Sequence, residues 1–430
     1  MNTITASPAP TIPERWAARF FTMWAGQAVS LVGSSLVQFA LVWWMTRTTG
    51  SATVLATATL IAMLPQIFLA PFAGALIDRW NRKAVMIVAD SLIALATLVL
   101  IYIFAIGRES ILAVYIILLI RSAGGSFHYP AMQASTSLMV PKTQLARIAG
   151  LNQTLSGIIS IISPPLGALL ISLLPMQGVL AIDIFTAIIA VSILAFIRVP
   201  QPPRQLAQAS GLTKKTTYWQ DLRGGWTYMI TWPGLLGVAL LAMVINFLLT
   251  PAGALIPLMV TKVFLKGALE LGWVDAAFGI GVIIGGLVLS AWGGFKKRIV
   301  TSMMGIIGMG IGIMLFGLLP ARLYYLALVG VFLFGSMQVM ANGPLSAIFQ
   351  STIDPDMQGR VMSLIGAGAT AMSPLSLLIA GPVSDWLGVR TWYLIGGSVC
   401  IVMTVIAFFI PVIMNIEENR QKQPVETQPE

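Results

Sequence analysis

The stretch Gly74–Lys83, GALIDRWNRK, places a group of charged side chains between two long apolar runs. Its charged residues are Asp78, Arg79, Arg82 and Lys83, in a chain of 430 residues of which only 9% are charged. The runs on either side, residues 51–77 and 84–106, are each long enough to cross a bilayer core of about 30 Å. We therefore predict a short polar turn between two membrane-spanning helices.

Apolar runs of this length recur along the whole chain, and hydrophobic residues make up 57% of it. A soluble protein would carry charge on roughly a quarter of its residues. The runs are continuously apolar, whereas a membrane β-strand would alternate, so we predict an all-α membrane protein. The expected twelve spans are 18–46, 51–77, 84–106, 111–140, 147–173, 177–198, 233–261, 270–293, 299–319, 323–350, 361–385 and 391–414.

The distribution of positive charge predicts the orientation of these spans. With the N-terminus in the cytoplasm, only six of the 25 Lys and Arg residues fall at outer ends, and one, Arg121, falls within a span. This asymmetry follows the positive-inside rule and predicts two cytoplasmic termini. The net charge of +10 is then explained by topology and not by a nucleic-acid partner. The single cysteine, Cys400, cannot form an intrachain disulfide, and we expect it to pack between helices.

Polar segments and an internal repeat predict the domain organisation. GLVLSAWGGFKK at Gly286 repeats GALIDRWNRK at Gly74 at an offset of about 212 residues, and Arg360 matches Arg147 at a similar offset. Two related six-helix halves are typical of secondary transporters. The expected parts are a cytoplasmic N-terminal segment (1–17), a first six-helix bundle (18–198), a cytoplasmic linker with an interfacial helix (199–232), a second six-helix bundle (233–414) and a cytoplasmic tail (415–430).

Several ionisable residues fall inside the predicted spans. A central Arg such as Arg121 costs about 2.5–3.5 kcal/mol on insertion scales, so it should face a cavity or a partner. It could serve the function, or it could pair with an acid and only hold helices together. His128 lies seven residues further on, roughly on the same helix face, and imidazole changes charge near neutral pH; a structural role is equally open. The acids at membrane depth are Asp90, Asp183 and Asp275, and we place Asp385 at a cytoplasmic helix end in a structural role.

Uncharged polar residues form stripes along three spans. The stripes are Gln27, Ser30, Ser34 and Gln38 in span one, Asn152, Ser156, Ser160 and Ser163 in span five, and Gln338, Asn342, Ser346 and Gln350 in span ten. Spacings of three and four residues put each stripe on one helix face. Such stripes either bind helices together or line a water-filled cavity.

These residues together resemble a known family. GALIDRWNRK resembles the signature Gly-x-x-x-Asp-Arg-x-Gly-Arg-Lys of the major facilitator superfamily, with Asn81 where Gly is usual. The stretches FFTMWAGQAVSLVGSSLVQFAL (20–41), IRSAGGSFHYPAMQASTSLMVP (120–141) and QGRVMSLIGA (358–367) are similar to bacterial macrolide-efflux pumps of the drug:proton antiporter group. The resemblance covers nearly the whole chain and implies twelve helices in a 6+6 pseudo-symmetric fold.

The resemblance also implies roles for individual residues. Spans one, four, seven and ten would line a central cavity, whose candidate residues are Gln27, Ser30, Ser34, Gln38, Tyr129, Asn246, Gln338 and Asn342. Arg121 matches an Arg associated with proton coupling, although the usual Gln three residues later is Gly124. The candidates for proton coupling are Arg121, Asp90, His128, Asp183 and Asp275. The candidate cytoplasmic gate is Gly74, Asp78, Arg79, Arg82, Lys83 and Arg360, with Asp78 facing the start of span eleven. SPPLGA, with Ser163 and Ala168 in place of Gly, looks like a degenerate antiporter motif.

The implied function is the export of lipophilic or amphipathic, macrolide-like compounds by proton antiport with alternating access. We expect a monomeric, multi-pass protein of the bacterial cytoplasmic membrane, driven by the proton gradient, with no metal, no organic cofactor and no nucleic-acid partner. No clustered catalytic constellation and no phosphate-binding P-loop is present in the sequence, so we expect a transporter and not an enzyme. Export of a siderophore or lipid-like metabolite, and proton-independent facilitation, remain open.

Overall fold

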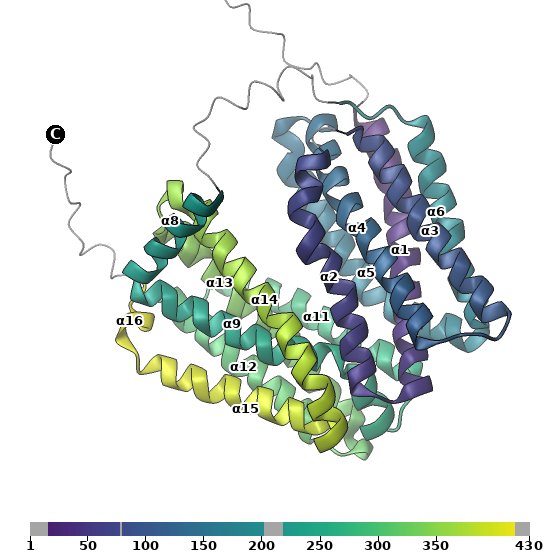
Figure 1. Ribbon diagram of the computed structural model, residues 1–430. Coiled ribbons are helices and arrows are strands. Elements are labelled where there is room, and N and C mark those ends of the chain that lie inside the picture. Colours follow the sequence, from purple (N-terminus) through teal and green to yellow (C-terminus); the bar gives the residue numbers. More distant parts are fainter. Residues whose placement is uncertain (1–15, 78–79, 202–217, 418–430) are drawn as a thin grey trace, which may run out of the picture. The chain divides into compact units, whose positions relative to one another are not determined.

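The computed structural model describes residues 16–77, 80–201 and 218–417, and nearly all of them are helical (Figure 1). The helices are α1 (Trp16–Thr49), α2 (Ala52–Ile77), α3 (Arg82–Ala105), α4 (Ile111–Met139), α5 (Leu145–Leu173), α6 (Met176–Phe196), α8 (Tyr218–Thr231), α9 (Pro233–Ala254), α10 (Ile256–Leu258), α11 (Ala268–Trp292), α12 (Arg298–Leu318), α13 (Tyr324–Thr352), α14 (Pro355–Leu387), α15 (Val389–Phe408) and α16 (Pro411–Met414). Short 3-10 turns precede α5 and α13. Within the described residues there is no β-strand.

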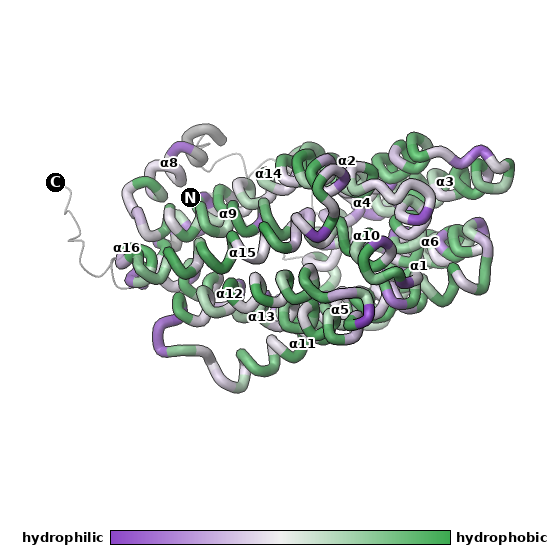
Figure 2. Tube along the Cα trace, turned by 90° about the horizontal axis from the view of Figure 1, so that it is seen from below, coloured by the Kyte–Doolittle hydropathy of each residue, from purple (hydrophilic) through white to green (hydrophobic). Residues whose placement is uncertain are grey.

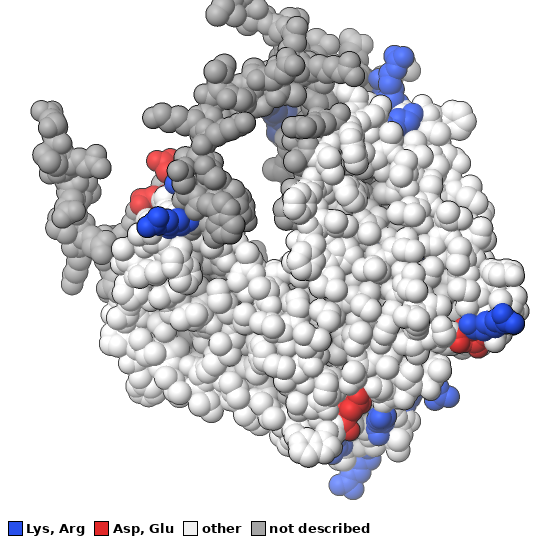
Figure 3. Space-filling model, viewed as in Figure 1, with Lys and Arg blue, Asp and Glu red and all other residues white. Residues whose placement is uncertain are grey.

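Twelve helices in the described part of the chain are long and apolar enough to cross a membrane, which confirms the all-α membrane fold. Figure 2 shows hydrophobic residues along the helices and hydrophilic residues mainly at the turns. Figure 3 shows that, on the visible face, the described charged side chains gather at helix ends and leave the surface between them uncharged. This pattern is expected where lipid covers the middle of each helix.

The turn after α2 explains why Asn81 replaces the usual glycine. Asn81 is the N-cap of α3, and its side-chain oxygen accepts a hydrogen bond from the backbone N–H of Ala84 at 3.2 Å. Asparagine is among the best residues at this position because it satisfies an otherwise unpaired amide. Residues 78–79 lie outside the described residues.

The structure corrects two of the expected spans. The seventh does not continue to residue 261, because α9 ends at Ala254 and is followed by α10 and a short π-helix, Met259–Val263. Pro257 lacks the N–H that would continue the α-helical hydrogen bonds. The twelfth is also interrupted, since α15 ends at Phe408 and α16 starts at Pro411. The short helix expected after the linker is present as α8.

The chain divides into two compact units. Unit 1 comprises Met1–Ala40, Ile61–Ile159 and Leu170–Thr213, and unit 2 comprises Leu41–Leu60, Ser160–Leu169 and Lys214–Glu430. In unit 1, α3 packs against both α4 and α6. This unit contains a buried cluster formed by side chains of α1, α2, α3 and α6, among them Phe20, Met23, Ile77, Met86 and Leu194.

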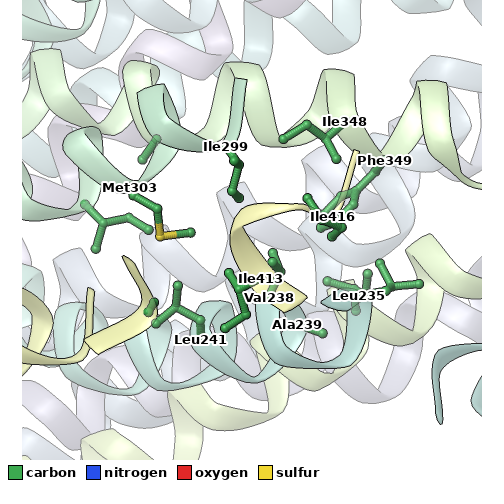
Figure 4. Close-up of a cluster of buried hydrophobic side chains, with 14 of the residues drawn as sticks. Leu235, Val238, Ala239, Leu241, Ile299, Met303, Ile348, Phe349, Ile413 and Ile416 are labelled. Carbon is green, nitrogen blue, oxygen red and sulfur yellow. The ribbon is translucent and has the colours of Figure 1, made fainter. Parts of the chain in front are cut away.

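In unit 2, α12 packs against α13 and α15, α11 packs against α13, and α9 packs against α14 and α15. Figure 4 shows part of the buried cluster that these helices share, with apolar side chains of α9, α12, α13 and α16 pointing toward one another. Cys400 is fully buried in α15, as expected for a packing role.

Within unit 2, hydrogen bonds to Asp385 link the start of α2 to the end of α14. The carboxylate of Asp385 accepts hydrogen bonds from the backbone N–H groups of Ala52 at 2.7 Å and Thr53 at 2.9 Å, and from the Ser51 hydroxyl at 2.8 Å. Asp385 therefore lies at the end of the helices where α1 passes into α2. In the predicted orientation this is the outer side, so the expectation of a cytoplasmic helix end was wrong. The physical reason is that, with the N-terminus in the cytoplasm, span eleven would run away from the cytoplasmic side, as span one would.

Candidate functional site

Unit 1 contains a cavity of about 700 Å³ between α1, α2, α3 and α4. Its polar and ionisable lining residues are Gln27, Ser30, Ser34, Gln38, Gln66, Asp90, Arg121, Ser122, Ser126, His128 and Tyr129. All four members of the polar stripe on α1 line it, because their spacing keeps them on one helix face. The volume lies within the range of cavities that hold drug-sized ligands.

Arg121 on α4 forms a buried ion pair with Asp183 on α6, with 2.5 Å between Nη1 and Oδ2. The same nitrogen donates to the hydroxyl of Thr97, and Thr97 donates to Asp183 Oδ2 at 2.9 Å. Ser34 of α1 donates to the other carboxylate oxygen at 3.0 Å. The side chains of Arg121 and Asp183 are 9% and 1% exposed. Arg121 thus has both of the environments expected for it, a cavity and an acidic partner.

Asp90 on α3 pairs with His128 on α4. Oδ1 of Asp90 lies 3.3 Å from Nε2 of His128, which makes an ion pair when the imidazole is protonated. Oδ2 accepts a hydrogen bond from the side-chain amide of Gln27 at 3.2 Å. Both Asp90 and His128 line the cavity, and their side chains are 7% and 14% exposed. The structure therefore brings four of the five proposed coupling residues into one region of unit 1.

The packing of α3 against α4 explains the missing glutamine of the span-four pattern. A Cβ atom at Gly124 would meet the side chain of Ile93 and approach the carbonyl oxygen of Ala89. Gly124 is buried, so a larger residue would require the Ile93 side chain, or the helices themselves, to shift. This close approach brings Asp90 within reach of His128.

Asp275 is not part of this cluster, because it lies on α11 in unit 2. Thr97, by contrast, was missed by the sequence analysis although it bonds to both Arg121 and Asp183. Its position seven residues after Asp90 on the same helix face was a signal that could have found it. Gln66, which lines the cavity from α2, was also missed.

Unit 2 contains a second cavity, of about 320 Å³, between α9, α12 and α13. Three of the candidate cavity residues, Asn246, Gln338 and Asn342, line it. Asn246 and Asn342 each donate a side-chain hydrogen bond to the carbonyl oxygen four residues earlier, at 2.9 and 3.0 Å. The rest of the lining is mainly aliphatic and thioether side chains, with Thr250 and Ser302 as further polar points. The sequence pattern had not indicated the α12 residues.

The residues proposed for a cytoplasmic gate are described only in part. Asp78 and Arg79 lie outside the described residues, and Gly74 lies within α2. Arg82 is 7% exposed and donates to the carbonyl oxygen of Ala134 on α4 at 2.7 Å. Lys83 donates to the carbonyl oxygen of Ala195, near the end of α6, at 2.7 Å. A cation at a helix C-terminus is favourable, so both basic residues tie α3 to its neighbours. Arg360 lies near the start of α14 in unit 2.

Comparisons with known proteins agree with this architecture. Macrolide efflux protein A of Streptococcus pyogenes is 34% identical over 402 residues, which cover 94% of this chain and 98% of that protein. Multidrug efflux pump Tap of Mycolicibacterium fortuitum is 25% identical over 394 residues, covering 88% of this chain and 92% of that protein.

Solved structures with the same fold include the nucleoside transporter NupG, with a TM-score of 0.64 and 13% identity over 92% of this chain and 98% of that one. A bacterial homologue of the iron transporter ferroportin in an inward-facing state has a TM-score of 0.64 and 17% identity over 90% of this chain and 98% of that one. A family model described as the Major Facilitator Superfamily matches residues 23–373 and, in a second, overlapping match, residues 252–428. With twelve membrane-spanning helices and these relatives, the chain belongs to the major facilitator superfamily.

Proposed function

We propose that this protein exports lipophilic or amphipathic compounds, among them macrolides, from the bacterial cytoplasm by proton antiport. The substrate class rests on the similarity to Macrolide efflux protein A and to the multidrug pump Tap. The export direction and the cytoplasmic position of both termini rest on the same relatives and on the positive-inside charge distribution. The protein works as a monomer in the cytoplasmic membrane, and alternating access moves the substrate site from one side to the other.

One observation carries the proton coupling: the buried charges of unit 1 are paired beside a cavity that can hold a drug-sized ligand. Ionisable side chains at membrane depth are costly and are kept for proton relays and ligand contacts. Asp90 and His128 reach this cavity directly, and Arg121 joins them there. A change in the protonation of Asp90 or His128 would alter the charge that a substrate meets in the cavity.

The polar and apolar parts of both cavities suit a bulky amphipathic substrate. In unit 2 the amides of Asn246, Gln338 and Asn342 stand among aliphatic and thioether side chains. Such walls adapt to variable apolar shapes, while a few polar groups orient the ligand. Asp78, Arg79, Arg82, Lys83, Gly74 and Arg360 are proposed to stabilise a closed cytoplasmic side, as in the family signature.

The test is a drug panel in an efflux-deficient bacterial host, measured with and without an uncoupler. We expect macrolide resistance that the uncoupler abolishes. Resistance that survives the uncoupler would favour a proton-independent facilitator, and absent macrolide resistance would favour a siderophore or lipid-like substrate. Arg121→Ala is expected to lose uncoupler-sensitive efflux, because it leaves the buried carboxylate of Asp183 without its cation. Undiminished efflux by that variant would contradict a role for the cluster.

A further inference from the structure

The two buried acids of unit 1 differ in the chemistry of their cationic partners. Asp183 pairs with a guanidinium, which stays charged at every pH a cell meets. Asp90 pairs with an imidazole, a side chain that can be neutral or protonated. Both Asp90 and His128 can therefore change charge, whereas in the first pair Arg121 cannot.

The hydrogen bonds around each acid follow the same division. Three side chains, those of Ser34, Thr97 and Arg121, donate hydrogen bonds to Asp183, whose side chain is 1% exposed. A proton on Asp183 would leave Arg121 as an uncompensated buried cation. Asp90 accepts one hydrogen bond from Gln27 on one oxygen, and its other oxygen faces His128.

Access to the cavity separates the pairs as well. Asp90 and His128 both line the unit 1 cavity, whereas, among the described residues, Asp183 and Thr97 are not part of its lining. Protons and substrate that enter the cavity therefore meet Asp90 and His128 first. Arg121 presents its cation to the cavity with Asp183 bound behind it.

We propose that the Asp90–His128 pair carries the exchanged proton, and that the Arg121–Asp183 pair is a fixed ion pair that positions α4 against α3 and α6. This inference rests on the proposed proton antiport and names the residues that perform it. The other ionisable groups around Asp90 and His128 are Arg121 and Tyr129 of α4, with Asp183 of α6 behind Arg121; α1 and α2 contribute the uncharged amides of Gln27 and Gln66. Since Arg121 and Asp183 cancel, one proton takes the Asp90–His128 pair from one net negative charge to none.

The test uses purified protein in proteoliposomes with radiolabelled erythromycin as the probe. Exchange is measured first without a pH gradient and then with a gradient of one pH unit. One pH unit is a tenfold ratio of proton activity, so exchange of one proton per drug molecule supports up to about tenfold accumulation when the membrane potential is held at zero and the passive uptake of protein-free liposomes is subtracted. We expect Asp90→Asn and His128→Gln to exchange erythromycin but to lose the response to the gradient, with accumulation falling to about onefold, and Asp90→Glu to retain it.

The matched variant replaces the other pair by apolar residues of similar size, Arg121→Met with Asp183→Leu. Replacing both members of a buried ion pair avoids an unpaired charge. The double variant is expected to keep the ratio of accumulation with and without the gradient, whatever its absolute rate. Thr97→Val makes the same test with a smaller change and should also keep the ratio.

The outcomes separate the two proposals. A gradient response that survives in both Asp90→Asn and His128→Gln, or that is lost in Thr97→Val or in a correctly assembled double variant, overturns the division of roles while leaving proton antiport intact. A wild-type protein without any gradient response overturns the proposed antiport itself.

Discussion

Replacing Asp385 by Ala should weaken the contact between the start of α2 and the end of α14. The carboxylate accepts the backbone N–H groups of Ala52 and Thr53, and the hydroxyl of Ser51, at 2.7–2.9 Å. Ser51 in turn accepts the N–H of Val54 at 3.3 Å. Three of the unpaired amides of the first turn of α2 are thereby satisfied. The acid comes from a segment more than 330 residues away in the chain.

The magnitude follows from the cap and the helix dipole. Loss of an N-cap acceptor costs about 0.5–2 kcal/mol, and a carboxylate near a helix N-terminus contributes about 0.3–1 kcal/mol at an exposed site. Asp385 is exposed, so we expect a combined loss of about 1–2 kcal/mol for the conformation with this contact. That loss corresponds to a factor of roughly 5–30 in its population relative to conformations without the contact.

The assay is pulsed electron–electron double resonance between two spin labels, attached to cysteines introduced at Arg47 and Arg390, which are exposed residues of unit 2. Cys400 is replaced first so that it takes up no label. Asp385→Ala should move population from the short-distance peak to longer distances by the factor given above. Trp386→Ala is the matched control, because Trp386 is next to Asp385 in the chain and its side chain is 85% exposed. A distance distribution in Asp385→Ala that equals that of the wild type would refute the reasoning.

Two further predictions concern packing and substrate contact. Gly285→Ala should destabilise the protein by about 1–3 kcal/mol, because a Cβ there would strike the backbone of Ser336 on α13. Gly286→Ala, where a Cβ meets open space, should not lower the thermal unfolding midpoint; equal midpoints in the two variants would contradict this packing. Gln338→Leu should weaken macrolide binding by about fivefold, the equivalent of one lost hydrogen bond. In inhibitory-concentration assays Ser346→Ala, on the same predicted stripe, serves as the control, and equal values for both variants would exclude a contact at Gln338.

The sequence predicted the helices well because their signal is local. Long apolar runs and polar turns marked spans two to four and eight to ten to within a few residues of α2–α4 and α11–α13. The seventh and twelfth spans were placed less well, because prolines interrupt apolar runs that composition alone treats as continuous. The same charge counting that oriented the spans should have placed Asp385 at the same end as the start of α2, to which it bonds, and not at a cytoplasmic end.

Which buried acid pairs with Arg121 and which with His128 could not be predicted from the sequence. Arg121 was expected to need a partner, but three acids were available, and the choice depends on how each helix is rotated and at what depth it lies. The structure selects Asp183 for Arg121 and Asp90 for His128. Gly124 contributes to this choice through the close packing of α4 on α3, which no periodicity reveals. Thr97, seven residues after Asp90 on the same face of α3, could have been found from this spacing, although a single hydroxyl in an apolar span is a weak signal.

The most direct test of coupled transport uses proteoliposomes loaded with erythromycin and a pH-sensitive dye, with no ion gradient imposed. Dilution into drug-free buffer at the same pH lets the drug leave down its own gradient. If protons and drug exchange through the cavity of Asp90 and His128, the lumen should acidify as the drug leaves, and faster than in protein-free liposomes, where erythromycin leaves only as its unprotonated amine. An uncoupler should collapse the change. Protein-dependent drug efflux with no more lumenal acidification than in the protein-free liposomes would contradict the account.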